Sequence, residues 1–207
     1  ASRTYSTAGM LDESGTRLEV VDLPRTFDPS SGSLEVELSP SLGAALSQAL
    51  EALTQEDHES AVGTMSQLLP NLAAYKALQE LAVEKPELQR RLDEELPGML
   101  DRITAMQNDD GGWGWWSGDD SSRVITSYLL FGLSQAQDAG VFVDNDVKQV
   151  AVEYLRATLP STDMLTRSWQ FDELAFQYFA LHEAGGGELS GVGNLYNHRQ
   201  QLSPWGK

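Results

Sequence analysis

Apolar side chains recur at steps of three and four residues over most of the chain, from about residue 40 to residue 181. This spacing places them on one face of an α-helix, so the sequence predicts about seven helices of roughly 10–20 residues. Pro97 stands inside one of these runs and predicts a break or a kink there. The runs are Leu42–Leu53, Met65–Leu72, Ala73–Val83, Glu87–Met106, Val124–Leu133, Val147–Leu159 and Met164–Leu181.

Short connections rich in Gly, Asp and Pro separate the helical runs, and two of them, Asp109–Gly112 and Gly185–Gly187, are expected at hairpin ends. Helices of this length with short loops are typical of stacked antiparallel hairpins. No clean repeat of about 34 or 40 residues supports the common solenoid families. We therefore expect a mainly α fold over residues 41–207, with an α/α toroid as the closed arrangement.

The first 40 residues differ from the rest. Leu18–Val21 and Leu34–Leu38 are short β-branched or alternating runs, separated by Pro24, Pro29 and a Ser/Gly-rich stretch. They predict two strands joined by a loop. Because a hairpin of that size buries too little to be stable alone, it is expected to belong to an adjoining β domain or to lie against the helices.

Composition excludes several classes of protein. The 207 residues carry 14 Lys+Arg against 31 Asp+Glu, a net charge of −17, which disfavours nucleic acid and anionic membranes as partners. With no cysteine, disulfides, zinc–thiolate sites and cysteine nucleophiles are excluded. No apolar run approaches the roughly 20 residues needed to cross a bilayer. The chain starts without a leader and Ser203-Pro204 is typical of a helix start, so we expect a piece of a longer protein.

The most distinctive segment runs from Gln107 to Trp116 and places Trp113, Trp115 and Trp116 among glycines. Such rings fit three roles: anchoring a hairpin end, forming a partner surface, or lining a ligand pocket. The spacing Gln-x-x-Asp-Gly-x-Trp also resembles the Gln–Trp repeat of triterpene cyclases, which ties together the loops of α/α barrels. Seen once, it indicates architecture rather than chemistry.

Candidate reactive groups are few. The acidic pairs Asp109-Asp110 and Asp119-Asp120 and the segment Asp144–Asp146 lack a metal-binding or cyclase pattern, and a solvated loop explains them. His58, His182 and His198 are not spaced as ligands on one helix face. The pair Asp172-Glu173 would serve a glycosidase only with a second carboxylate opposite. We therefore expect no catalytic residue, metal or cofactor.

Three segments are distinctive when taken together: Thr64–Leu72, Asp110–Trp116 running into Thr126–Tyr128, and Leu195–Lys207. Their order and spacing resemble one family, the thioester domain of the alpha-2-macroglobulin and complement-component superfamily in its bacterial branch. The resemblance implies an α/α toroid inserted in a β-sandwich, so residues 1–40 would be the chain entering from that sandwich and residues 41–207 an incomplete toroid.

The chain departs from the family pattern at the segment that forms the internal thioester. In thioester-bearing members the segment reads Gly-Cys-x-Glu-Gln, and the Cys thiol condenses with the Gln carboxamide. The corresponding positions here are Glu59, Ser60, Ala61, Val62 and Gly63, so neither chemical partner is present. Ser60 is expected to cap the helix that follows.

By resemblance, the chain is expected to be a fragment of a bacterial, extracytoplasmic endopeptidase inhibitor that entraps proteases without a covalent bond. Its partners would be proteases, met through the full-length parent, and other domains of the same protein. One alternative is an enzyme on an α/α toroid, either a terpene-cyclase relative or a glycan-active enzyme. It predicts a deep axial pocket lined by acids and aromatics. Another is a non-inhibitory envelope scaffold, which predicts exposed rings at Trp113–Trp116.

Overall fold

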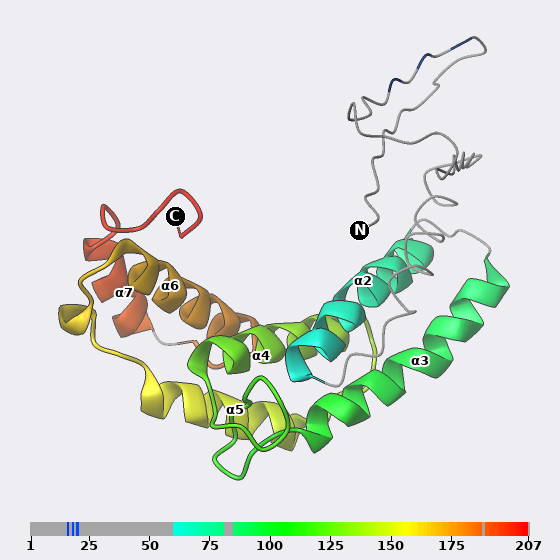
Figure 1. Ribbon diagram of the computed structural model, residues 1–207, viewed down its shortest axis with the longest axis horizontal. Helices are drawn as coiled ribbons and strands as arrows, with labels where there is room; N and C mark the ends of the chain where they lie inside the picture. The colour runs from blue at the N-terminus through cyan, green and yellow to red at the C-terminus, as the bar shows by residue number, and fades with distance from the viewer. Residues whose placement is uncertain are drawn as a thin grey trace, which may run out of the picture. The chain divides into compact units, whose positions relative to one another are not determined.

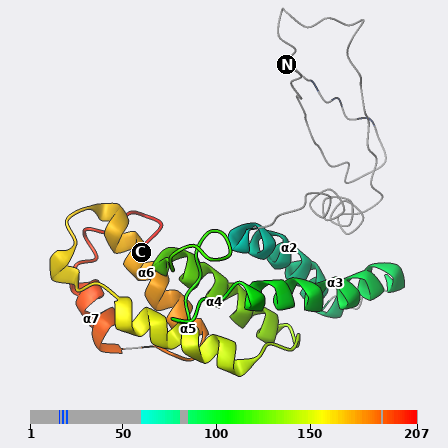
Figure 2. The ribbon, with the colours of Figure 1, turned by 60° about the horizontal axis from the view of Figure 1, so that its bottom comes forward.

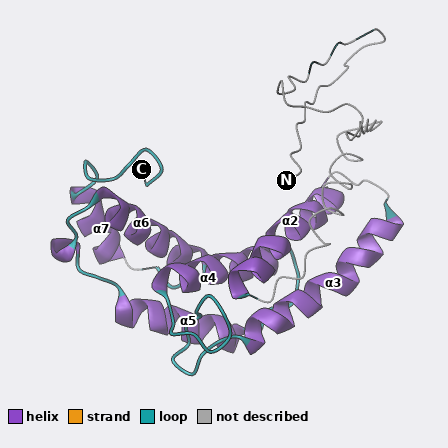
Figure 3. Ribbon diagram, in the orientation of Figure 1, coloured by secondary structure: helices purple, strands orange, loops and turns teal. Residues whose placement is uncertain are grey.

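The computed structural model describes residues 16, 18, 20, 60–80, 85–187 and 189–206, and these residues contain helices and loops but no strand (Figure 3). The chain divides into two compact units, Ala1–Pro40 and Ser41–Lys207. The described helices all belong to the second unit. They are α2 (Ala61–Glu80), α3 (Pro86–Ala105), α4 (Arg123–Asp138), α5 (Asn145–Thr158), the 3-10 turn Thr162–Met164, α6 (Ser168–Glu183) and α7 (Leu189–Asn197).

The expected strands and the first expected helix fall largely outside the described residues. Of the predicted strand over residues 18–21, only Leu18 and Val20 are described, and both are exposed. The predicted strand over residues 34–38 and the predicted helix over residues 42–53 lie wholly outside. The β segment therefore remains a prediction.

The helices are stacked as antiparallel hairpins (Figures 1 and 2). Helix α2 packs on α3, α4 on α5, and α6 on α7, so each hairpin joins neighbours in sequence. Helices α2, α4 and α6 also pack against one another in a row, and α5 contacts α6. The hairpin stacking predicted from the helical periodicity is thus present.

One continuous apolar core joins α2, α3, α4 and α5. It includes the fully buried side chains of Met65, Leu68, Leu92, Leu129 and Leu155. Truncating a core leucine of this kind to alanine costs about 2–5 kcal/mol. A second, smaller cluster of Phe171, Leu174, Leu195 and Leu202 holds α6, α7 and the segment after α7 together.

Helices α2 and α4 approach closely at Gly132. A β-carbon built on Gly132 would lie 1.9 Å from the Sδ atom of Met65, which is fully buried in α2. A side chain at this crossing would therefore displace Met65 or move the two helices apart, so the glycine serves packing and not backbone conformation. The crossing joins α4, which follows the α3–α4 loop, to α2, whose first amide donates to that loop.

Of the break or kink predicted at Pro97, the break is wrong, because α3 runs without interruption from Pro86 to Ala105. A kink there stays a prediction. A proline removes one backbone hydrogen bond, from its own nitrogen to the carbonyl four residues earlier. Here that carbonyl belongs to Asp93, and both Asp93 and Pro97 are exposed, so water can satisfy the free oxygen. The opposite face of α3 stays anchored by Leu92 and Leu96.

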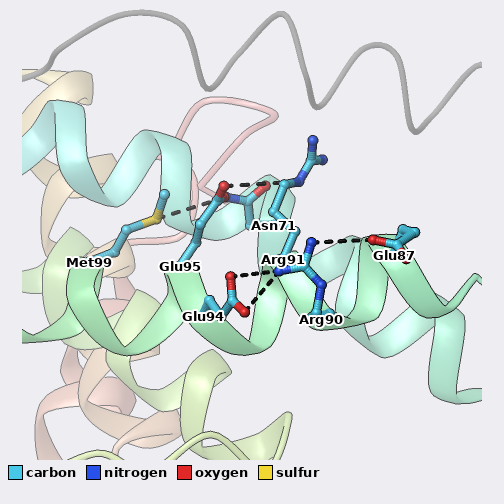
Figure 4. A network of polar contacts seen from close by, with 7 residues as sticks. All are labelled: Asn71, Glu87, Arg90, Arg91, Glu94, Glu95 and Met99. Atoms are coloured by element: carbon cyan, nitrogen blue, oxygen red, sulfur yellow. Dashed lines mark hydrogen bonds and ion pairs between the residues drawn. The ribbon is translucent and has the colours of Figure 1, made fainter.

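Charged side chains run along the solvent side of α3 (Figure 4). The Arg90 guanidinium lies 2.9 Å from Glu94 and 3.2 Å from Glu87, but these side chains are 62–89% exposed, so the pairs add little stability. On the buried side, the Asn71 amide of α2 donates to the Met99 Sδ of α3 over 3.8 Å. A thioether sulfur is a weak acceptor, so this contact adds little to the apolar packing between the two helices.

Candidate functional site

The start of α2 is formed by Ser60, which is 7% exposed. Its Oγ accepts the backbone N–H of Gly63 over 3.0 Å, and its carbonyl accepts the N–H of Thr64 over 2.9 Å. The Thr64 hydroxyl donates to the same carbonyl over 3.0 Å. A serine hydroxyl that satisfies the third amide of a helix is a regular N-cap. The predicted capping role of Ser60 is confirmed.

Around this cap, no side chain of the described residues 60–63 supplies an acyl group. Gly63 has no side chain, Val62 is aliphatic, and Ser60 is engaged in the cap. Glu59 lies outside the described residues. Forming an internal thioester requires a thiol and a carboxamide, and the chain has no cysteine at all. No internal thioester can therefore form at the start of α2.

The loop over residues 107–122, called here the tryptophan loop, joins α3 to α4 and touches the start of α2. The Ala61 N–H, the first amide of α2, donates to the Trp115 carbonyl over 3.2 Å. This bond satisfies one of the helix amides that have no partner within the helix. The loop and the helix start therefore form one unit.

Trp113 anchors the tryptophan loop in the core. Its ring is fully buried, its Nε1–H donates to the Ile103 carbonyl over 2.8 Å, and its backbone N–H donates to the Thr126 Oγ1 over 2.9 Å. Trp115 and Trp116 differ, because they are 51% and 52% exposed. The structure thus separates the three tryptophans into one structural anchor and two surface rings.

Polar side chains fix the loop from within. The Asp110 Oδ1 accepts the Ser121 hydroxyl over 2.7 Å and the N–H of Gly112 over 3.0 Å. The Asn108 amide donates to the Ser121 Oγ over 2.9 Å and to the Asp119 carbonyl over 2.8 Å. Two residues predicted to be merely solvated, Asp110 and Asp119, are therefore also part of the loop's hydrogen-bond network.

Helix α5 contacts the tryptophan loop and supports it. The Gln107 amide donates to the carbonyls of Gly111, over 2.9 Å, and of Val147 in α5, over 3.0 Å. Gly111 has a φ of +86° and leaves no room for a β-carbon, which would lie 2.5 Å from the Val150 carbonyl oxygen. The Gln107–Trp113 segment therefore ties a loop to a neighbouring helix, as its spacing indicated.

Tyr154 of α5 adds a further support, which sequence reasoning missed. Its hydroxyl donates to the Ser121 carbonyl over 3.0 Å. Burial raises the pKa of this phenol, and the nearby Asp110 raises it further. Tyr154 occupies an ordinary helical position, so its neighbours in the sequence give no sign of this contact. The same is true of Ser121.

Three of the remaining candidates, Asp144, Asp172 and His198, are also engaged in structure, and His58 lies outside the described residues. Asp144 caps α5 by accepting the N–H of Asp146 over 2.9 Å, and Asp172 accepts the N–H of Ser203 over 2.9 Å. The His198 ring stacks on Phe171 with centroids 5.8 Å apart. Within the described part of the chain, no group of three His, Cys, Asp or Glu side chains could hold a metal ion.

An open pocket of about 310 Å³ lies beside α6 and the segment that follows α7. It contains a single acid, Asp163, and is otherwise lined by Thr162, Leu165, Thr166, Phe171, His198 and Gln201. An acid pair for glycoside hydrolysis is missing from this lining. The pocket also shares no lining residue with the start of α2 or the tryptophan loop.

Comparison with known families gives a match to the A-macroglobulin TED domain over residues 35–160. The chain belongs to this family. Two proteins named alpha-2-macroglobulin are similar: that of Thermotoga maritima, 28% identical over 138 residues, and that of Rickettsia conorii, 24% identical over 156 residues. The matches cover 67% and 74% of this chain but only 8% of each relative, so the chain spans a small part of their length.

Solved structures of bacterial alpha-2-macroglobulins share the fold of this TED-family chain. The native Escherichia coli protein, from domain MG7 to its C-terminus, matches with a TM-score of 0.61 at 20% identity, covering 76% of this chain and 26% of that one. The Salmonella protein reacted with methylamine matches with a TM-score of 0.61 at 22% identity, covering 79% of this chain and 11% of that one. The predicted mainly α, α/α-toroid fold is confirmed.

None of the described helices has both the length and the apolar character needed to cross a membrane.

Proposed function

We propose that this chain is part of a bacterial alpha-2-macroglobulin-like protein that inhibits endopeptidases outside the cytoplasm by entrapping them without a covalent bond. In the parent, proteases and the other domains of the same protein would be its partners. Residues 1–40 would come from an adjoining β-sandwich, and residues 41–207 would form part of the toroid. Family membership and the bacterial alpha-2-macroglobulin relatives support this assignment.

The observation that carries the non-covalent part of the proposal is the cap at the start of α2. Glu59, Ser60, Val62 and Gly63 stand at the positions that the family resemblance gives to the thioester segment. The backbone N–H of Gly63 donates to the Ser60 Oγ over 3.0 Å. This pair stabilises a helix but cannot form an internal acyl bond, because Gly63 has no side-chain carbonyl. The toroid would serve as a packing and interaction surface and not as an enzyme.

The test uses the full-length parent protein and a panel of endopeptidases. Residual protease activity is measured on a large protein substrate and on a small peptide substrate, and adducts are sought by denaturing gel and mass spectrometry. Entrapment predicts that activity on the large substrate falls while activity on the small one persists, with no adduct. Unchanged activity on both substrates would refute inhibition, and an adduct would refute the non-covalent mechanism.

A matched variant separates structure from chemistry at Ser60. Ser60→Ala removes the hydroxyl, and Ser60→Asp replaces it with another capping side chain. If Ser60 acts only as a cap, inhibition by the folded Ser60→Asp parent should equal that of the unmodified parent. Loss of inhibition in this variant at unchanged stability would show that the hydroxyl has a chemical role.

A second candidate function is that of a non-inhibitory envelope scaffold. The half-exposed rings of Trp115 and Trp116 favour it, since a surface that docks a partner is expected to present such side chains. Unchanged protease activity in the assay above, together with a partner bound through this loop, would favour the scaffold over the inhibitor.

A further inference from the structure

Trp115 and Trp116 are presented on a backbone that is already fixed. The Trp115 carbonyl accepts the Ala61 N–H over 3.2 Å, the Trp116 N–H donates to the Asp119 Oδ2 over 3.1 Å, and the Trp116 carbonyl accepts the Asp119 N–H over 3.2 Å. At Gly114, a β-carbon would lie 2.5 Å from the Cβ of Asp119, so the two sides of the loop are in close contact. A partner that binds these rings would have little loop ordering to induce.

The surroundings of the two rings are acidic. Four exposed aspartates, Asp109, Asp110, Asp119 and Asp120, belong to the tryptophan loop, which contains no lysine or arginine. The next cation along the chain is the exposed Arg123, at the start of α4. Asp110 and Asp119 also accept hydrogen bonds within the loop, which leaves their negative charge in place. The two indoles therefore lie within a strongly negative segment of a chain with net charge −17.

We propose that the tryptophan loop binds an arginine- or lysine-bearing segment of a partner protein. A cation placed over an indole face is attracted by the ring, and tryptophan is the best aromatic residue for this contact. The neighbouring carboxylates would receive charge-assisted hydrogen bonds from the same side chains. Nucleic acid and anionic lipid do not fit this surface, because both would be repelled by its charge. This inference does not depend on protease entrapment and holds equally for a scaffold.

The test titrates the full 207-residue chain with a short peptide of alternating Arg and Gly, its Lys counterpart, and a Glu–Gly peptide of equal length. Binding is measured by calorimetry at low and at high salt. The key variant is Trp115→Ala/Trp116→Ala, and its matched control is Trp169→Ala, because Trp169 of α6 is also 52% exposed. For charge, Asp120→Asn is compared with Asp101→Asn, another exposed aspartate, on α3.

The Arg peptide should bind, the Glu peptide should not, and added salt should weaken the complex. The double tryptophan variant should bind on the order of tenfold more weakly, whereas Trp169→Ala should bind like the unmodified chain. Asp120→Asn should weaken binding more than Asp101→Asn. Equal binding of the Arg and Glu peptides, or equal losses in the key and control variants, would overturn the proposal.

A measurement on the unmodified chain tests the binding site even if the double variant misfolds. In a nitrogen-15 spectrum the indole N–H signals of Trp115 and Trp116 should shift on addition of the Arg peptide, while those of Trp113 and Trp169 should not. Shifts confined to other tryptophans, or spread equally over all of them, would contradict binding at this loop.

Discussion

Replacing Gly132 by alanine tests whether the close contact between α2 and α4 limits what this fold accepts. The new β-carbon would start 1.9 Å from the Met65 Sδ and 2.5 Å from its Cε, whereas ordinary contact begins near 3.4 Å. Met65 is fully buried, so its side chain has no route to solvent. Either Met65 adopts a poorer rotamer or the two helices separate.

The magnitude follows from two opposing effects. Alanine is favoured over glycine inside a helix by about 1 kcal/mol, and overpacking a core of this kind costs about 1–3 kcal/mol. Gly98 in α3 provides the matched control, since its β-carbon would meet nothing within 4 Å. Gly98→Ala should therefore stabilise the chain by about 1 kcal/mol. Gly132→Ala should be about 1–3 kcal/mol less stable than Gly98→Ala.

Urea denaturation followed by far-UV circular dichroism measures both free energies of unfolding. A third arm places Gly132→Ala in a Met65→Ala background, where the space is open and the same substitution should become stabilising. This sign change would identify Met65 as the source of the cost. If Gly132→Ala stabilises the unmodified chain as much as Gly98→Ala does, the reasoning about this helix crossing is refuted.

Three further predictions concern the candidate site and α5. Ser60→Ala should lower the free energy of unfolding by about 1 kcal/mol, with Ser60→Asp losing less, and equal urea midpoints for both would contradict the cap. Trp113→Phe removes the donor to the Ile103 carbonyl and should cost about 1–3 kcal/mol in the same assay, while Trp115→Phe should be close to neutral. Burial lowers the pKa of Lys148 below 10.5, although Asp138 opposes the shift. Because the unfolded chain then binds the proton more tightly, stability should rise with pH between the lowered pKa and 10.5, and Lys148→Met should remove this rise in a pH series of urea midpoints.

Helical periodicity predicted the hairpins because burial of one helix face is a local property of the sequence. The same periodicity was less informative about the residues at which each helix begins and ends. The runs Met65–Leu72 and Ala73–Val83 contribute to a single helix, α2, which passes through Pro70. The run Met164–Leu181 begins at the last residue of the 3-10 turn, and α6 starts only at Ser168. The Gln170 Oε1 accepts the N–H groups of Thr166 and Arg167, just before that start.

The candidate site was predictable only where the interaction is local. The Ser60 cap spans three residues, and the sequence suffices to predict it. The separate roles of Trp113 and Trp115 depend instead on where the loop meets Ile103, Thr126 and Ala61, and residue spacing cannot specify such long-range contacts. The close contact at Gly132 is similarly hidden from the sequence, because it is made with Met65, which belongs to a different helix.

The bond between Ala61 and Trp115 also has a mechanical consequence. The chain enters α2 at Ser60, so tension applied there acts first on the bonds around this residue. Two hydrogen bonds to the Ser60 carbonyl and one to its Oγ hold the first turn of α2, whereas a single backbone bond of 3.2 Å links that turn to the tryptophan loop. A displacement of residue 60 would therefore act on the Trp115 carbonyl through the Ala61 N–H. Force on the incoming chain and the position of the two surface indoles are thereby coupled.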